Sequence, residues 1–138
     1  MINILLVGSG AREVAIARKI KESSIESSLF CVASSTNPQI KKLSSAYFEQ
    51  SLGDVCSVVA VAKKVSVDIA IIGPENPLEL GLVDALEKEG VACVGPRKAV
   101  AKIETSKAFA RNILDSCAPE KNPKRKVFSS LDGCEDFL

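Results

Sequence analysis

The sequence predicts an α/β fold built on a doubly wound parallel sheet, and two observations support this prediction. Short apolar runs alternate along the chain with segments whose apolar residues recur every three or four positions. Each run leads into a turn of glycine, proline or small polar residues, at 8–13, 34–38, 73–77 and 95–98. Apolar strands separated by amphipathic helices are typical of parallel sheets covered on both faces, which bind ligands beyond the carboxyl ends of their strands.

Four strands and three helices are predicted in the first ninety-four residues. Each strand is a short apolar run bounded by glycine, proline or charge. The predicted strands are 2–7, 29–33, 68–72 and 91–94. The predicted helices, which carry an apolar stripe, are 12–21, 52–64 and 78–89. Strand and helix therefore alternate, as the connections of a parallel sheet require.

The C-terminal part of the chain changes character. Residues 104–116 have a helical pattern with Thr105 or Ser106 near its start. The next stretch, 117–126, reads CAPEKNPKRK and holds two prolines and four basic residues, so it is predicted as a linker or an extended lead into a strand.

The remaining residues suggest the beginning of a second region. A strand is expected at 126–130, and the start of a helix at 130–132. We therefore expect one domain over 1–116, followed at 117–138 by a linker and the start of another region.

The overall composition excludes several classes of protein. The chain has 138 residues, of which 46% are hydrophobic and 25% charged, as expected of one globular domain. Its 18 basic and 17 acidic residues give a net charge of +1, so no global field favours nucleic acid or a membrane surface. No apolar stretch is long enough to span a bilayer, and the N-terminus lacks the pattern of a signal peptide. The sequence predicts a cytoplasmic protein with no nucleic-acid or membrane partner.

Cysteine and histidine usage limits the possible chemistry. The chain contains no histidine, which excludes Ser-His and Cys-His catalytic pairs. Its five cysteines are scattered without a C-x-x-C pair, so reduced and mostly buried thiols are expected rather than a metal site. These cysteines are Cys31, Cys56, Cys93, Cys117 and Cys134.

The turn after the first predicted strand reads GSGAREVA, residues 8–15, and has the composition of a phosphate-binding loop. A dinucleotide site would need a third glycine where Glu13 stands, and a carboxylate at the end of the second strand, where 31–35 has none. NAD is therefore disfavoured, while another nucleotide, another phosphate ester or a simple tight turn stay open. Arg12 either binds an anion or pairs with Glu13 or a distant carboxylate.

A second candidate turn follows a middle strand. The stretch GPENPLELG, 73–81, holds Glu75 and Asn76 at the carboxyl edge of the sheet, where a carboxylate suits sugar hydroxyls or an amine. The alternative is that Glu75 caps the following helix. Further on, Lys107 follows Thr105 and Ser106 at a predicted helix start, which is suited to a second phosphate.

The chain resembles the N-terminal domain of the phosphoribosylamine–glycine ligase family, also called glycinamide ribonucleotide synthetase. The resemblance rests on three stretches, which read ILLVGSGAREVAIARKI, IAIIGPENPLELGLVDALEKEGVACVGP and AKIETSKAFARNIL. It covers about residues 1–116 in order, which is more specific than any single motif. The SSTNP stretch at 34–38 and the GPRK…IETSK form are similar to archaeal members.

The resemblance implies a Rossmann-like pre-ATP-grasp domain of an enzyme of purine biosynthesis. That enzyme joins glycine to 5-phosphoribosylamine with ATP and magnesium or manganese, through an acyl phosphate of glycine. The residues it implies for phosphoribosylamine binding are Gly8, Ser9, Gly10, Arg12, Glu13, Glu75 and Asn76. Lys107 corresponds to a lysine that approaches the ATP phosphates, and no catalytic or metal-binding residue is assigned.

Two departures from the family are expected to matter. The family has histidine after the Arg-Glu pair, whereas this chain has Val14. The ATP-grasp lobes, which would be partners in the same polypeptide, lie beyond residue 138, so the chain is expected to be an inactive fragment. The alternatives are a nucleotide-binding domain of an oxidoreductase and a non-catalytic ligand-binding module. The basic stretch 121–125 is read as a solvated linker.

Overall fold

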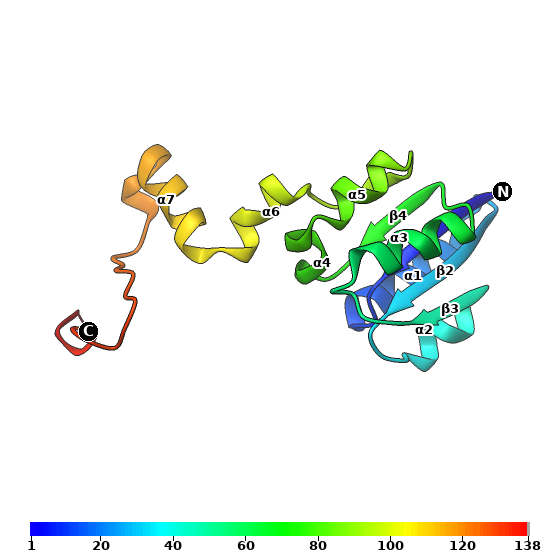
Figure 1. The fold of residues 1–138 in the computed structure, drawn as a ribbon, viewed down its shortest axis with the longest axis horizontal. Coiled ribbons are helices and arrows are strands. Elements are labelled where there is room, and N and C mark those ends of the chain that lie inside the picture. The colour runs from blue at the N-terminus through cyan, green and yellow to red at the C-terminus, as the bar shows by residue number, and fades with distance from the viewer. Residues whose placement is uncertain (138) are drawn as a thin grey trace. The chain divides into compact units, whose positions relative to one another are not determined.

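The computed structural model describes residues 1–137, which fall into two compact units (Figure 1). Unit 1 is Met1–Ala101, and unit 2 runs from Lys102 to the end of the described residues. None of the helices in residues 1–137 combines the length and the apolar character needed to cross a bilayer. The two units are described in turn.

Unit 1 is a five-stranded parallel sheet, which confirms the predicted fold class. Its strands are β1 (Ile2–Val7), β2 (Ser27–Ala33), β3 (Ala46–Glu49), β4 (Ile69–Ile72) and β5 (Ala92–Val94). Their order is β3-β2-β1-β4-β5, and every pairing is parallel. The chain steps outward from β1 to β3 and then returns to the other side of β1 for β4. The strand order thus reverses between β1 and β4, which is where such sheets bind ligands.

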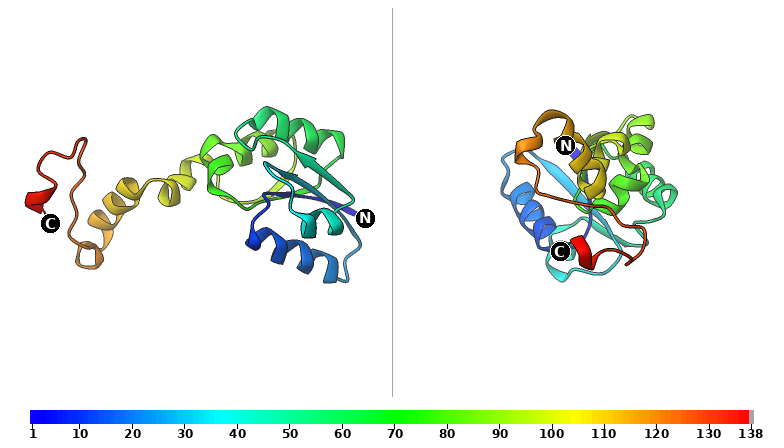
Figure 2. Two further views of the ribbon diagram at one scale, coloured as in Figure 1. Left: turned by 90° about the horizontal axis from the view of Figure 1, so that it is seen from below. Right: turned by 90° about the vertical axis from the view of Figure 1, so that its left-hand side faces the viewer.

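Helices cover both faces of this sheet (Figure 2, left). The helices of unit 1 are α1 (Ala11–Glu22), α2 (Pro38–Leu43), α3 (Val55–Lys64), α4 (Glu75–Leu80) and α5 (Leu82–Lys88). On one face Leu6 packs with Ala17 of α1 and Ile40 of α2. On the other face Leu5 belongs to a larger apolar cluster formed with α3, α4 and α5. The alternation of neighbouring β1 residues between two cores explains why the strand is apolar from Ile4 to Val7.

The four predicted strands are confirmed, but a fifth strand and two helices, α2 and α6 (Lys98–Thr105), were not predicted. Two of these elements are short: β3 has four residues and α2 has six. Asn37 accepts hydrogen bonds from the Gln39 and Ile40 amides and Pro38 follows it, so α2 begins with a standard N-cap that the apolar pattern did not reveal.

Two predicted helices of unit 1 need correction. The helix predicted over 52–64 begins at Val55, because the Asp54 carboxylate caps it by accepting the Ser57 amide. The helix predicted over 78–89 is two helices, α4 and α5. They meet at Gly81, whose φ of +89° breaks the helical backbone.

Unit 2 is helical and begins within α6 (Lys98–Thr105), which α7 (Lys107–Cys117) follows. The Ser106 hydroxyl accepts the Phe109 amide and caps α7, so the helix predicted over 104–116 starts at 107. The strand predicted at 126–130 is wrong, since no strand pairs with that segment among the described residues. The helix predicted to start at 130–132 is also wrong: these residues form bends and a turn.

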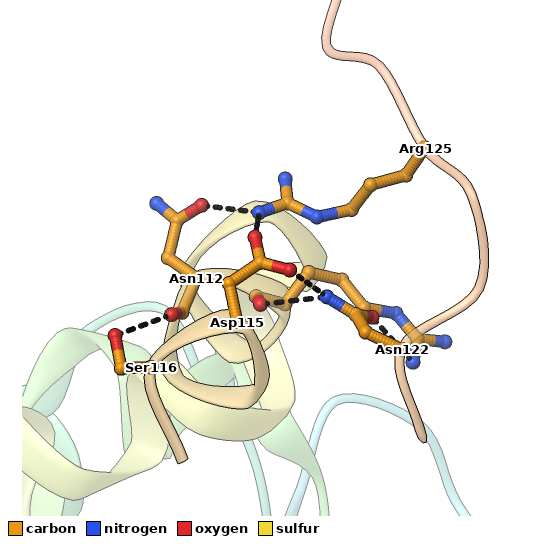
Figure 3. Close-up of polar contacts among 6 residues, drawn as sticks. Asn112, Asp115, Ser116, Asn122 and Arg125 are labelled. Atoms are coloured by element: carbon orange, nitrogen blue, oxygen red, sulfur yellow. Dashed lines mark hydrogen bonds and ion pairs between the residues drawn. The ribbon is translucent and has the colours of Figure 1, made fainter. Parts of the chain in front are cut away.

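The segment predicted as a linker, 117–126, is tied to α7 by side chains (Figure 3). It contains one turn of 3-10 helix at Pro119–Lys121. The Asn122 amide nitrogen donates to the Arg111 carbonyl at 3.0 Å and to Asp115 Oδ1 at 2.6 Å. Arg125 donates to Asn112 Oδ1 at 2.6 Å and pairs with Asp115. Hydrogen bonds from Asn122 and Arg125 lower the pKa of Asp115.

Candidate functional site

The candidate site lies at the carboxyl ends of β1 and β4, where two loops meet. Each loop begins by continuing the strand ladder. The Gly8 amide donates to the Val32 carbonyl at 2.8 Å, and the Gly73 amide donates to the Val7 carbonyl at 3.0 Å. The loops 8–10 and 73–74 are therefore fixed by the backbone of the sheet.

Glu13 is buried between these two loops, with 4% of its surface exposed. Its Oε2 accepts the Gly10 amide at 2.5 Å. A Cβ atom at Gly73 would lie 2.0 Å from Glu13 Oε1, and one at Gly10 would lie 2.7 Å from Oε2. Gly8 has a φ of +119°, and a Cβ there would contact Glu13 at 3.1 Å. The glycines of both loops thus make room for a carboxylate of the chain itself.

This arrangement leaves a defined set of backbone donors for an anion. Because Glu13 takes the Gly10 amide, that amide is not free for a phosphate. The amides of Ser9, Ala11 and Arg12 have no acceptor within residues 1–137. Any phosphate held by backbone groups at the start of α1 would therefore use these three donors.

Arg12 connects the two loops from the solvent side. Its Nε lies 3.2 Å from Glu13 Oε1, and its Nη2 lies 3.6 Å from Glu75 Oε1. The hydrogen bond to Glu13 raises the pKa of Arg12, with a smaller contribution from the charge of Glu75. The side chains of Arg12 and Glu75 are 57% and 50% exposed, and exposed ion pairs are weak, so a stronger anion can displace the contact with Glu75.

The second candidate turn is placed as predicted, beside the first. Glu75 and Asn76 are the first two residues of α4, and both are exposed. The N-cap of α4 is Pro74 and no side chain caps it, so the alternative role of Glu75 as a helix cap is not realised. The structure therefore brings together Gly8, Gly10, Arg12, Glu13 and Glu75. Ser9 and Asn76 are neighbours of these residues in the chain, at the glycine turn and at the start of α4. Lys107 is the exposed first residue of α7 and belongs to unit 2.

A third loop, at the turn predicted over 34–38 after β2, supports the glycine turn through contacts that the sequence did not predict. The Asn37 side chain donates to the Ser9 carbonyl at 2.8 Å, and the Ser9 and Ser35 hydroxyls lie 3.2 Å apart. The Tyr47 hydroxyl accepts the Asn37 amide at 3.1 Å and donates to the Ser35 carbonyl at 2.7 Å. The Asn-Pro pair at 37–38 was a detectable signal, since it is a common start for a short helix.

Cys31 and Val14 lie in the core beneath this site. The Cys31 thiol donates to the Gly8 carbonyl at 3.5 Å, and burial raises its pKa to about 12, which makes it a poor nucleophile. Val14 is half-buried and packs against the apolar cluster under α1. Within residues 1–137 no cluster of three or more Cys, Asp or Glu side chains is arranged to hold a metal ion.

Comparisons with known sequences identify close relatives. The profile of a family described as "Phosphoribosylglycinamide synthetase, N domain" matches residues 2–104. The phosphoribosylamine–glycine ligases of Methanococcoides burtonii and Pyrococcus abyssi are each 42% identical to this chain, over 99% of its length. The matches cover 32% and 30% of those proteins, so the chain spans about a third of the length of the curated relatives it matches.

Comparisons with solved structures agree on the fold. The N5-carboxyaminoimidazole ribonucleotide synthetase of Thermotoga maritima superimposes with a TM-score of 0.74 at 14% identity, over 100% of this chain and 36% of that one. The phosphoribosylglycinamide synthetase of Anaerococcus prevotii gives a TM-score of 0.65 at 14% identity, over 83% and 28% of the two chains. At these identities the likeness shows the α/β fold.

Proposed function

The chain belongs to the phosphoribosylglycinamide synthetase N-domain family, and from this premise we propose that it is the substrate-binding part of an ATP-dependent ligase of purine biosynthesis. The proposed reaction joins glycine to 5-phosphoribosylamine. One observation carries the proposal for this chain: Arg12 bridges Glu13 and Glu75 where the loops after β1 and β4 meet. That point combines a cation, free backbone donors and an exposed carboxylate, which suits a phosphorylated sugar.

Different residues are proposed to bind different parts of the ligand. The 5-phosphate is held by the amides of Ser9, Ala11 and Arg12 and by the Arg12 guanidinium. Glu75 accepts hydrogen bonds from ribose hydroxyls, with the Asn76 amide beside it. Glu13 acts through Gly10 and Arg12, whose positions it fixes, since its carboxylate is directed into the protein.

The chemistry requires an activated carboxylate. The carboxylate oxygen of glycine attacks the terminal phosphorus of ATP and ADP leaves. The ribosylamine nitrogen then attacks the carbonyl carbon, and inorganic phosphate leaves. This domain contributes by fixing the direction of the amine, which lowers the entropic cost of the second step. Lys107 is proposed to contact the ATP phosphates.

Other parts of the proposal concern regions found in the longer relatives. Residues 1–137 offer no ligand set for magnesium or manganese, so we assign the metal to the segments that only the longer relatives contain. The division into a domain over 1–116 and a linker region over 117–138 is retained in this proposal, as is a cytoplasmic location. Val14 stands where the family has histidine, and because its side chain packs against the apolar cluster under α1, position 14 offers no polar group to a ligand. Ligation by this chain alone is not expected.

Ribose 5-phosphate tests the proposal as a stable substitute for the labile amine. In a two-dimensional NMR titration of the 138-residue chain, it is expected to shift the amides of 8–13 and 75–76. Ribose and NAD are the comparison ligands. Binding of NAD at these amides, or no response to ribose 5-phosphate at millimolar concentration, would refute the proposed site.

A pair of variants sharpens this test. Glu75→Gln keeps the shape of the side chain and removes its charge, so the affinity for ribose 5-phosphate is expected to fall about tenfold. Glu79→Gln is the matched control, since Glu79 is an exposed carboxylate on the same helix outside the bridge. Equal effects of the two substitutions would remove Glu75 from the site.

A further inference from the structure

Each carbonyl group of the glycine turn, residues 8–10, accepts a hydrogen bond from within the protein. The Gly8 carbonyl accepts one from the Cys31 thiol at 3.5 Å. The Ser9 carbonyl accepts one from the side-chain amide of Asn37 at 2.8 Å. The third carbonyl accepts one from a backbone amide of α1 at 3.1 Å. All three carbonyl oxygens of the turn are therefore directed toward the protein.

The direction of these carbonyls sets the direction of the amides next to them. In a trans peptide the carbonyl and the following amide point in opposite directions, and residues 1–137 contain no cis peptide bond. Because the Gly8 carbonyl points to a buried thiol, the Ser9 amide points away from the core. Because the Gly10 carbonyl points along α1, the Ala11 amide points away from that helix. The two amides are thus turned outward by the groups that hold the carbonyls.

The middle peptide of the turn, between Ser9 and Gly10, is held at both ends. Its carbonyl accepts the hydrogen bond from Asn37 Nδ2, and its amide donates to Glu13 Oε2 at 2.5 Å. Rotation of this peptide would break both hydrogen bonds, one of which satisfies a buried carboxylate. The middle peptide therefore restrains the two peptides beside it, which carry the outward amides.

The two side chains that hold the turn are themselves fixed. Asn37 Oδ1 caps α2 by accepting the Gln39 and Ile40 amides, which leaves its NH₂ group for the turn. The Asn37 backbone amide donates to the Tyr47 hydroxyl at 3.1 Å. Cys31 lies in the core, and because burial raises the pKa of its thiol to about 12, the thiol keeps the proton that it donates.

We propose that Asn37 and Cys31 are positioning residues for phosphate binding at the glycine turn. By holding two carbonyls inward, they direct the Ser9 and Ala11 amides toward a phosphate before it binds. Donors that are already oriented lose less entropy on binding, so the phosphate is bound more tightly. Neither side chain has to touch the ligand. The identity of the ligand as a phosphorylated sugar rests on the proposed function, whereas the orientation of the turn does not.

A substitution at Asn37 tests the first contact. Asn37→Asp keeps an oxygen to cap α2 and replaces the donor with a second oxygen, which repels the Ser9 carbonyl. In an NMR titration of the 138-residue chain with inorganic phosphate, followed at the Ser9 and Ala11 amides, the affinity is expected to fall about tenfold. Urea unfolding is expected to show little change in stability, because the cap is kept.

The matched control for this variant is Gln39→Glu. It adds the same negative charge to an exposed side chain of α2 that does not contact the turn. Its affinity for phosphate is expected to fall less than about twofold, because exposed charges are screened. Equal losses in Asn37→Asp and Gln39→Glu would overturn the role of Asn37, since charge alone would then explain both.

A pair of substitutions at Cys31 tests the second contact. Cys31→Ala removes the donor, and Cys31→Ser restores one in a similar volume. Since a thiol is a weak donor, Cys31→Ala is expected to weaken phosphate binding about threefold, and Cys31→Ser is expected to recover the affinity of the wild type. A role in packing alone predicts the opposite order, because serine places a hydroxyl in the core. Weaker binding by Cys31→Ser than by Cys31→Ala would overturn the role of Cys31.

Inorganic phosphate also separates this inference from the proposed function. If phosphate binds the wild type and Asn37→Asp equally, the inference is wrong, whatever ribose 5-phosphate does. If phosphate binds the wild type more tightly than Asn37→Asp, and ribose 5-phosphate binds no more tightly than phosphate, the proposed sugar ligand is wrong and the inference stands. If phosphate leaves the Ser9 and Ala11 amides unshifted, the turn binds no anion and both proposals are wrong.

Discussion

The two units of the molecule are stabilised in different ways. Unit 1 has two apolar clusters on either side of a sheet, and both contain side chains with no exposed surface. Among residues 102–137 no side chain is buried, and apolar residues such as Val127 and Leu131 are 67% and 88% exposed. Unit 2 instead relies on polar contacts between α7 and the segment that follows it. A site on unit 1 is therefore held rigidly by its scaffold, while one on unit 2 depends on a few hydrogen bonds.

Thiol reactivity should show the largest difference between the units. Burial raises the pKa of Cys31 from its ordinary value of 9.0 to about 12, whereas Cys117 is exposed in unit 2. At pH 8 the thiolate fraction of Cys31 is about a thousandfold below that of an ordinary thiol, and labelling by a thiol reagent should be slower by at least that factor.

The same shift gives unit 1 a defined pH dependence. Between pH 9.0 and about 12 the unfolded chain releases the Cys31 proton while the folded protein keeps it, so the free energy of unfolding falls as pH rises.

The exposed Cys56 of unit 1 is the control for the thiol-labelling experiment. It should react like Cys117, because burial rather than membership of a unit sets the rate. Rapid labelling of Cys31 at pH 8 would show that the core opens.

Truncation of a core side chain should have the next largest effect. Leu6 has no exposed surface, so Leu6→Ala is expected to lower the free energy of unfolding by about 2–5 kcal/mol. Ile113→Ala is the counterpart in unit 2, where the side chain is 39% exposed, and it should cost less than about 1 kcal/mol. Urea unfolding followed by circular dichroism measures both. Similar losses would mean that α7 is packed against a core as firmly as the sheet is.

Substitutions in the loops of the two units should differ least in their effect on the free energy of unfolding. A Cβ at Gly73 would displace the Glu13 carboxylate, so Gly73→Ala is expected to cost about 1–3 kcal/mol and to weaken ribose 5-phosphate binding. Gly53→Ala is its control, since the nearest atom would lie at 3.4 Å. Equal stability of Gly73→Ala and wild type would show that Glu13 is not confined between the loops.

In unit 2, Asn122→Ala is expected to lower the free energy of unfolding by at most about 1 kcal/mol and to speed hydrogen exchange only near 107–126.

Much of unit 1 was predictable because its signals are local. A six-residue run with five apolar residues identified β1. The turns after β1 and β4 were expected to lie at one edge of the sheet, as they do. Short elements escaped because four residues of β3 carry too little pattern, and its pairing with β2 is decided by contacts distant in sequence. The break at Gly81 escaped because a glycine within an apolar stripe does not reveal its φ angle.

The residues of the candidate site were named from the sequence, but the contacts among them were not. The sequence placed Arg12, Glu13 and Glu75 near one another and left open whether Arg12 pairs or binds an anion. The structure shows that it pairs with both carboxylates. The error at 126–130 arose because a β-like run forms a strand only when a partner strand is available, and no strand within residues 1–137 pairs with this segment.

By itself the sequence determined the alternation of strands and helices, the edge of the sheet at which polar side chains collect, and the resemblance to the ligase family. These follow from periodicity and turn residues, which act over a few neighbouring positions. Only the tertiary structure decided that the glycines of two loops surround the Glu13 carboxylate. Gly73 and Glu13 are distant in sequence, and the placement of their loops side by side depends on how whole elements pack.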